Sequence, residues 1–190
     1  MRNQIFICYS HADSEYQCRL KVHLASFERR NLIQLWTDNN LRAGDSWVEK
    51  IEEEIDKAAI AILLISADFL YSEFIANKEL PRILEAWEKN EVRILPVMVH
   101  YCAYEHIEPL ANIQFANDPN RPLSIMDVNE REKVWADLSR EIYIQLKKEK
   151  DKQKNNQEIG LETQYEEDDF FLEPIDYFFE EDIFNFNSED

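Results

Sequence analysis

The sequence predicts an α/β protein in which helices cover both faces of a parallel sheet. Short apolar segments alternate with amphipathic ones along residues 1–150, the pattern of strands that alternate with helices. One segment, residues 60–65, reads IAILLI and has no polar position, as expected for a strand covered on both faces. Parallel sheets of this kind bind ligands beyond the carboxyl ends of their strands. We therefore look for function in the loops that follow the strands.

Four strands and four helices are expected. The strands are residues 5–9, 32–36, 60–65 and 92–99. The helices are residues 15–30, 47–58, 69–88 and 128–148, the first with apolar positions at Leu20, Val22, Leu24 and Phe27. Pro81 should kink or split the third helix, because proline cannot donate a helical hydrogen bond. Pro96 indicates that the fourth strand lies at a sheet edge or carries a bulge.

Charge and glycine content exclude several kinds of function. The chain has 190 residues, 45% of them hydrophobic, and a formal net charge of -18. Such a field repels phosphate backbones and anionic lipids, so we expect no direct binding to nucleic acid or membrane. The only glycines are Gly44 and Gly160, which excludes phosphate-binding turns that need several glycines. The longest predominantly apolar run, residues 58–67, contains only one polar residue, Ser66, and is too short to span a bilayer.

The cysteines predict a reduced, cytoplasmic protein. Cys8, Cys18 and Cys102 are odd in number and show neither disulfide-like nor C-x-x-C spacing, and the N-terminus has no signal-peptide pattern. His100, Cys102 and His106 offer three zinc ligands, but no fourth ligand has suitable spacing. We therefore expect no metal site.

Composition changes near residue 150. Residues 151–190 contain 14 acidic and two basic side chains, and eight aromatic residues are interleaved with the acids. We assign residues 1–148 to the α/β domain and residues 149–190 to an acidic, aromatic-rich tail. A disordered, solvating tail is one interpretation. The aromatic residues favour a segment that folds on binding, either to a basic, apolar groove of a partner or to this protein's own domain.

Ordered blocks of the sequence match the pattern of one known domain family. Residues 5–13 read IFICYSHAD, and residues 36–47 read WTDNNLRAGDSW, which contains the family's L-x-x-G-x-x-W spacing. Residues 62–70 read ILLISADFL, and residues 72–80 read SEFIANKEL, with a Glu seven positions after a Ser. Residues 93–97, RILPV, resemble the family's fourth strand. Together these blocks resemble the TIR domain family. The resemblance covers about residues 3–146 and implies a flavodoxin-like TIR fold.

The resemblance also implies a reaction. Many TIR domains cleave NAD at the nicotinamide–ribose bond, and others are assembly adaptors. Active members need a helix glutamate at the place of Glu79. Cleavage builds positive charge at the ribose C1′, which a nearby carboxylate stabilises. Because nicotinamide is already a cationic leaving group, neither a metal nor a cofactor is implied: NAD is the substrate and Glu79 is the catalytic residue.

The implied substrate-binding residues come from the loops around the strand ends. They are Tyr9, Ser10, His11, Asp38, Arg42, Trp47, Ser66 and Phe74. Active relatives often carry Arg or Lys at the positions of Ser10 and His11, and we expect Arg42 to supply the missing charge. Each of these roles has a simpler alternative. Most helical glutamates are solvated, and Glu79 has this alternative. Ser10 beside His11 is typical of a turn, and Trp47 is equally suited to packing.

The resulting hypothesis is an enzyme that yields nicotinamide and ADP-ribose, or a cyclic or conjugated ADP-ribose, in bacterial antiphage defence. Its activation is expected to come from self-association through TIR–TIR contacts or from a partner that binds the tail. The rival hypothesis is a non-enzymatic interaction module or effector that acts through the same contacts. Nicotinamide release by the wild type and by Glu79→Ala would separate the two.

Overall fold

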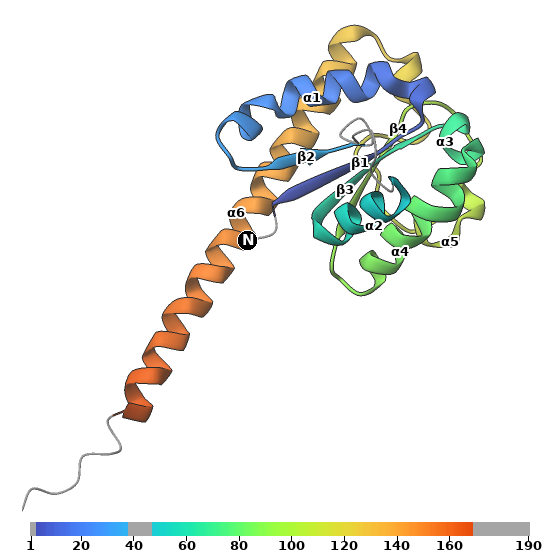
Figure 1. Cartoon of the computed structure of the whole chain (residues 1–190). Helices are drawn as coiled ribbons and strands as arrows, with labels where there is room; N and C mark the ends of the chain where they lie inside the picture. The colour runs from blue at the N-terminus through green and yellow to red at the C-terminus, as the bar shows by residue number, and fades with distance from the viewer. Residues whose placement is uncertain (1–2, 38–46, 169–190) are drawn as a thin grey trace, which may run out of the picture. The chain divides into compact units, whose positions relative to one another are not determined.

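The structure of the protein, a computed structural model, describes the backbone of residues 3–37 and 47–168 and the side chains of residues 3–37 and 48–148. It divides into two compact units, Met1–Lys148 and Glu149–Asp190. The first unit holds a sheet with helices packed on it (Figure 1). Within the described part of the chain, every helix is too short or too polar to cross a membrane.

Four parallel strands form the sheet, in the order β2-β1-β3-β4. They are β1 Gln4–Cys8, β2 Gln34–Trp36, β3 Ala58–Ile65 and β4 Arg93–Met98. Every residue of β1 and β3 is buried, because these strands lie in the centre of the sheet and helices cover both of its faces (Figure 1). The predicted α/β fold with a parallel sheet is confirmed.

The helices form one layer on each face of the sheet (Figure 1). The helical elements are η1 His11–Asp13, α1 Ser14–Arg29, α2 Trp47–Lys57, α3 Ala67–Tyr71, η3 Ile75–Glu79, α4 Leu80–Glu88, η4 Tyr104–His106, α5 Glu108–Ala111, η5 Leu123–Ile125 and α6 Val128–Asp168. Successive strand residues point to opposite faces. Ile5 and Ile7 therefore share one apolar core with α1 and α6, whereas Phe6 and Cys8 share the other with α2 and α4.

The third predicted helix is interrupted. A π-helical turn, Ile75–Glu79, separates α3 from α4. The amide of Leu80 donates to the carbonyl oxygen of Ile75, five residues back, which is the wide hydrogen bond that defines a π-helix. Pro81 lies in the first turn of α4, where a missing N–H is tolerated. The helix is interrupted, but at Ser72 and not at Pro81 as predicted, and the π-helical turn that follows makes Glu79 the last residue of a widened turn.

β4 lies at an edge of the sheet, as Pro96 predicted. The connection that follows β4 covers this edge. The buried Asn117 side chain accepts a hydrogen bond from the Met98 amide at 2.9 Å and donates one to the Met98 carbonyl at 3.1 Å. The amide of Ala116 donates to the carbonyl of Pro96 at 2.8 Å. The backbone of β4 is thus bonded by the protein's own chain.

Two expectations about helices are wrong. Val22 is 59% exposed, because the buried face of α1 is the one that carries Leu20 and Leu24, one helical turn apart, and Val22 lies on another face. The last helix does not end near residue 148 but continues to Asp168. Lys, Glu and Gln fill much of this stretch and favour helix, and Gly160 is its only glycine.

Candidate functional site

Glu79 lies inside the protein, next to the carboxyl end of β1. Its exposed fraction is 5%, so it is not the solvated carboxylate that most helical glutamates are. Oε2 of Glu79 accepts a hydrogen bond from the Cys8 thiol at 3.2 Å, and Cys8 is the last residue of β1. The contact joins the π-helical turn to a central strand at the end where sheets of this kind bind ligands.

Three predicted substrate-binding residues, Tyr9, Ser10 and His11, follow β1 directly. Tyr9 is buried, Ser10 is half-buried and His11 is exposed, and the rings of Tyr9 and His11 lie 5.8 Å apart. The Ser10 hydroxyl accepts a hydrogen bond from the Ala12 amide at 3.4 Å and caps η1. Because the loop begins one residue after Cys8, it lies at the same end of β1 as Glu79.

Four further predicted site residues, Asp38, Arg42, Trp47 and Phe74, lie later in the sequence. Phe74 is half-buried and packs against the core beneath α2 and α4. Trp47 begins α2, but its side chain lies outside the described residues, as do Asp38 and Arg42 as a whole. The substrate contacts expected of these residues stay predictions.

Ser66 belongs to a second polar cluster, which also lies beyond the carboxyl ends of the strands. It is fully buried; its hydroxyl donates to Oδ2 of Asp13 at 2.5 Å and accepts from the Phe69 amide at 2.9 Å. The second bond caps the start of α3. Ser66 thus holds α3 and η1 together, and its contact with a substrate stays a prediction.

Sequence reasoning missed two members of this cluster, Asp13 and His100. Asp13 is 1% exposed, and Nε2 of His100 lies 3.6 Å from its Oδ1. Burial raises the pKa of the Asp13 carboxyl, against smaller lowering effects of the Ser66 hydrogen bond and of His100. The available signal was position, because Asp13 closes the first block of the sequence and His100 follows β4. Both therefore lie beyond the carboxyl ends of strands.

No group of three or more His, Cys, Asp and Glu side chains arranged to hold a metal ion occurs among the described residues. Cys102, one of the zinc ligands considered, is half-buried. Burial, followed by the nearby Glu105, raises the pKa of its thiol to about 11. Such a thiol rarely becomes the thiolate that a metal or a nucleophilic reaction needs.

A parallel sheet with polar clusters at the carboxyl ends of its strands defines an α/β domain suited to bind a ligand beyond those strand ends. A family model of the TIR domain, TIR_2, matches residues 5–158, which is most of the chain. The chain therefore belongs to the TIR domain family, as its sequence blocks indicated.

The chain is similar to one curated protein and to solved structures of TIR domains. The uncharacterized protein y4lF of Sinorhizobium fredii is 26% identical over 144 residues, 76% of this chain and 41% of the relative; the chain thus spans less than half of that protein's length. The TIR domain of the Toll-related receptor TRR-2 from Hydra magnipapillata has a TM-score of 0.52 and 20% identity, over 73% of this chain and 97% of that chain. The TIR domains of the activated Roq1 resistosome have a TM-score of 0.46 and 16% identity, over 74% of this chain and 82% of that chain.

Proposed function

We propose that the protein is an NAD-consuming TIR enzyme that cleaves the bond between nicotinamide and ribose. The observation that supports this best is the buried carboxylate of Glu79, hydrogen-bonded to Cys8 at the end of β1. Burial of a carboxylate is unfavourable unless the surroundings compensate it. A buried carboxylate at the ligand-binding edge of an α/β sheet therefore favours a role in chemistry over a role in packing alone.

In the proposed reaction the bond between C1′ of the ribose and the nicotinamide nitrogen breaks, and its electron pair leaves with nicotinamide. The nicotinamide departs neutral, so no general acid is needed. Positive charge develops at C1′, and the carboxylate of Glu79 stabilises it in surroundings from which water is largely excluded. Water then adds to C1′ and releases a proton to give ADP-ribose, or an adenine nitrogen or another acceptor adds instead.

Residues around Glu79 supply the substrate contacts in this proposal. Ser10, His11 and Arg42 are assigned to the ribose and the phosphates, and Trp47 is assigned to stacking. Tyr9, which follows Cys8 in the chain, is assigned to the ribose and the phosphates as well. The contacts of Asp38, Ser66 and Phe74 complete the predicted set.

We further propose that assembly controls the activity. TIR–TIR contacts that involve the loop of residues 39–47 would complete the site, and such a switch would keep NAD consumption off until a trigger arrives. The tail, residues 149–190, is the proposed binding segment for an activating or effector partner. A role in bacterial antiphage defence and a cytoplasmic location belong to the same proposal. The location is supported by the three cysteines, all in the described part of the chain, none of which forms a disulfide.

The test is release of nicotinamide from NAD by the full chain at high protein concentration or with a crowding agent. Glu79→Gln keeps the shape of the side chain and removes its charge, and should lower the rate on the order of 10²-fold. The matched control is Glu73→Gln, an exposed glutamate close to Glu79 in the chain, which should keep the wild-type rate. The mass of the product distinguishes ADP-ribose from a cyclic or conjugated product.

Lack of turnover in every assembled form would contradict the enzyme and favour the non-enzymatic interaction module. Turnover that is equal in the wild type and in Glu79→Gln would leave the activity and remove Glu79 from it.

A further inference from the structure

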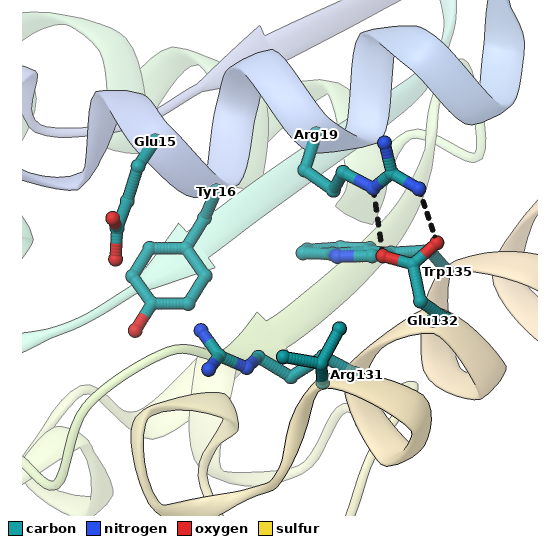
Figure 2. A pocket seen from close by; sticks show the side chains of 7 residues that line it. Glu15, Tyr16, Arg19, Arg131, Glu132 and Trp135 are labelled. Atoms are coloured by element: carbon teal, nitrogen blue, oxygen red, sulfur yellow. Dashed lines mark hydrogen bonds and ion pairs between the residues drawn. The ribbon is translucent and has the colours of Figure 1, made fainter.

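A pocket of about 370 Å³ opens between α1 and the start of α6 (Figure 2). Its charged and aromatic lining residues are Glu15, Tyr16, Arg19, Arg131, Glu132 and Trp135. Tyr16 and Trp135 belong to the core that α1 and α6 form with one face of the sheet, whereas Cys8, the partner of Glu79, belongs to the core on the other face. The pocket therefore lies on the opposite face of the sheet from Cys8 and Glu79, although the Tyr16 ring lies 5.7 Å from the ring of His100 and shares its core with Tyr9.

Two of the charges in this pocket neutralise each other. Arg19 donates from Nε and Nη2 to the two carboxylate oxygens of Glu132, at 2.7 and 2.5 Å (Figure 2). Nε2 of His23 lies 3.0 Å from the same carboxylate. The hydrogen bond from Arg19, with help from His23, lowers the pKa of Glu132 to about 2. Glu132 is thus ionised at neutral pH and its charge is balanced by Arg19.

Arg131, the other arginine of the pocket, has no ion pair like that of Arg19 among the described side chains. Its Nε is buried and has no hydrogen-bond partner in the part of the chain whose side chains are described. Figure 2 shows its guanidinium group turned toward Tyr16, away from the Arg19–Glu132 pair. Buried polar groups almost always have a hydrogen-bond partner. Nε itself is too deeply buried for a ligand to reach, but the guanidinium group also carries donors on its two terminal nitrogens, and these are the atoms of Arg131 that a ligand in the pocket could contact.

The first turn of α6 fixes the place of Arg131. The amide of Glu130 donates to Oδ1 of Asp127 at 3.0 Å, and the amide of Asp127 donates to Oε2 of Glu130 at 3.1 Å, which is a capping-box arrangement. Glu130 also forms an ion pair with Arg121. Because Glu130 is engaged by these partners, it does not neutralise Arg131.

We propose that this pocket binds a small organic oxyanion, a carboxylate or a phosphate ester on an apolar ring, through Arg131. The guanidinium group presents paired donors that match two oxygens of such a group. Val128 and the ring of Tyr16 line the pocket and provide apolar surface for the ring of the ligand. The volume is near the lower end of the roughly 300–1,000 Å³ of small-molecule sites, which suits a single ring.

Tyr16 adds a second donor at the same place. Burial, followed by the nearby Glu15, raises the pKa of its hydroxyl above the usual value of 10.0. The hydroxyl is therefore protonated at neutral pH and able to donate to an oxyanion. Glu15 has the opposite effect on binding, because its carboxylate is exposed beside the pocket and repels an anion.

Calorimetric titration of the full chain with benzoate, phenyl phosphate and uncharged benzamide tests the proposal. At least one of the two anions should bind ~10-fold or more tightly than benzamide, because hydrogen bonds to charged groups are the strong ones. The tighter anion identifies the group that the pocket prefers. Arg131→Gln should remove the preference for the anion. The matched control, Arg140→Gln, changes an exposed arginine on the same helix that pairs with Asp137, and should keep the preference.

A second variant keeps the test valid if Arg131→Gln folds poorly. Glu15→Gln removes the repelling carboxylate and should tighten binding of the anion by ~2–5-fold. Glu79→Gln should bind the anion as the wild type does, whatever its effect on NAD, so this site and the proposed enzyme can fail separately. Equal affinity of the wild type for all three compounds, or an unchanged preference in folded Arg131→Gln, would overturn the proposal.

Discussion

Two buried carboxylates near the carboxyl ends of the strands, Asp13 and Glu79, are held by different chemistry. Asp13 accepts a hydrogen bond from the Ser66 hydroxyl at 2.5 Å and lies 3.6 Å from the His100 ring. Glu79 accepts its hydrogen bond from the thiol of Cys8, and a thiol is a weak donor. The Asp13 cluster joins three segments and serves the fold. In the proposed reaction the Glu79 carboxylate has a different task, the stabilisation of a developing cation.

The largest effect is expected when the Glu79 carboxylate is kept but displaced. Glu79→Asp shortens the side chain by one methylene and withdraws the charge from C1′. Displacement of a catalytic group by about 1 Å costs on the order of 10²-fold in rate, so nicotinamide release should fall by about that factor. The thermal midpoint should change little, and a wild-type rate in Glu79→Asp would show that the position of the charge is unimportant.

Removal of the other carboxylate should affect stability. Asp13→Ala leaves the buried Ser66 hydroxyl without its acceptor, which should lower the free energy of unfolding by ~1–3 kcal/mol. Thermal unfolding measures this as a lower midpoint. Glu28→Ala, at an exposed position of α1, is the control and should stay within about 0.5 kcal/mol of the wild type. A wild-type midpoint in Asp13→Ala would contradict the structural role of the cluster.

A smaller effect is expected from the donor to Glu79. Cys8→Ala removes the hydrogen bond and should reduce nicotinamide release by ~3–10-fold, the equivalent of one ordinary hydrogen bond. Cys8→Ser retains a donor and should recover most of the rate. The control is Cys18→Ser, because Cys18 is exposed on α1. Equal rates in the alanine and serine variants would mean that the thiol does not position Glu79.

The smallest effect concerns a half-buried carboxylate, Glu132. Its pKa is lowered from 4.5 to about 2, chiefly by Arg19. The Arg19–Glu132 pair therefore stabilises the fold above pH 4.5, and this contribution is lost as the pH falls toward 2. Glu132→Gln should cost about 1 kcal/mol or less at pH 7. The difference from the wild type should shrink in thermal melts at pH 3, and a difference that grows on acidification would contradict this assignment.

Much of the fold could be predicted from sequence because the burial of a strand determines which residue types occur along a few consecutive positions. The run from residue 60 to residue 65 has no polar position, and Pro96 marks an edge strand. The extent of α6 was missed because the charge-rich segment after residue 148 was assigned to the tail, although its residues favour helix. The π-helical turn could not be predicted, because the hydrogen bond from Leu80 to Ile75 leaves no signal in apolar spacing.

The candidate site also has a part that could be predicted from sequence and a part that could not. Glu79 and the residues after β1 could be found because they belong to contiguous blocks that resemble a family. The contacts of Ser66 with Asp13, and of Asp13 with His100, could not be found, because they depend on the order of β1, β3 and β4 in the sheet. The thiol donor to Glu79 was missed for the same reason, since Cys8 lies in an apolar strand and has the character of a small core residue.

The covered edge of β4 limits how copies of this domain can meet. An open edge strand invites a strand from another molecule, but the Asn117 amide already occupies both backbone groups of Met98, and Pro96 has no N–H to offer. Strand addition along β4 would first have to expel this side chain. We therefore expect copies in a filament or ring to contact one another through helices and loops, and not through a sheet continued across the β4 edge. Electron microscopy of the assembled protein can check this geometry.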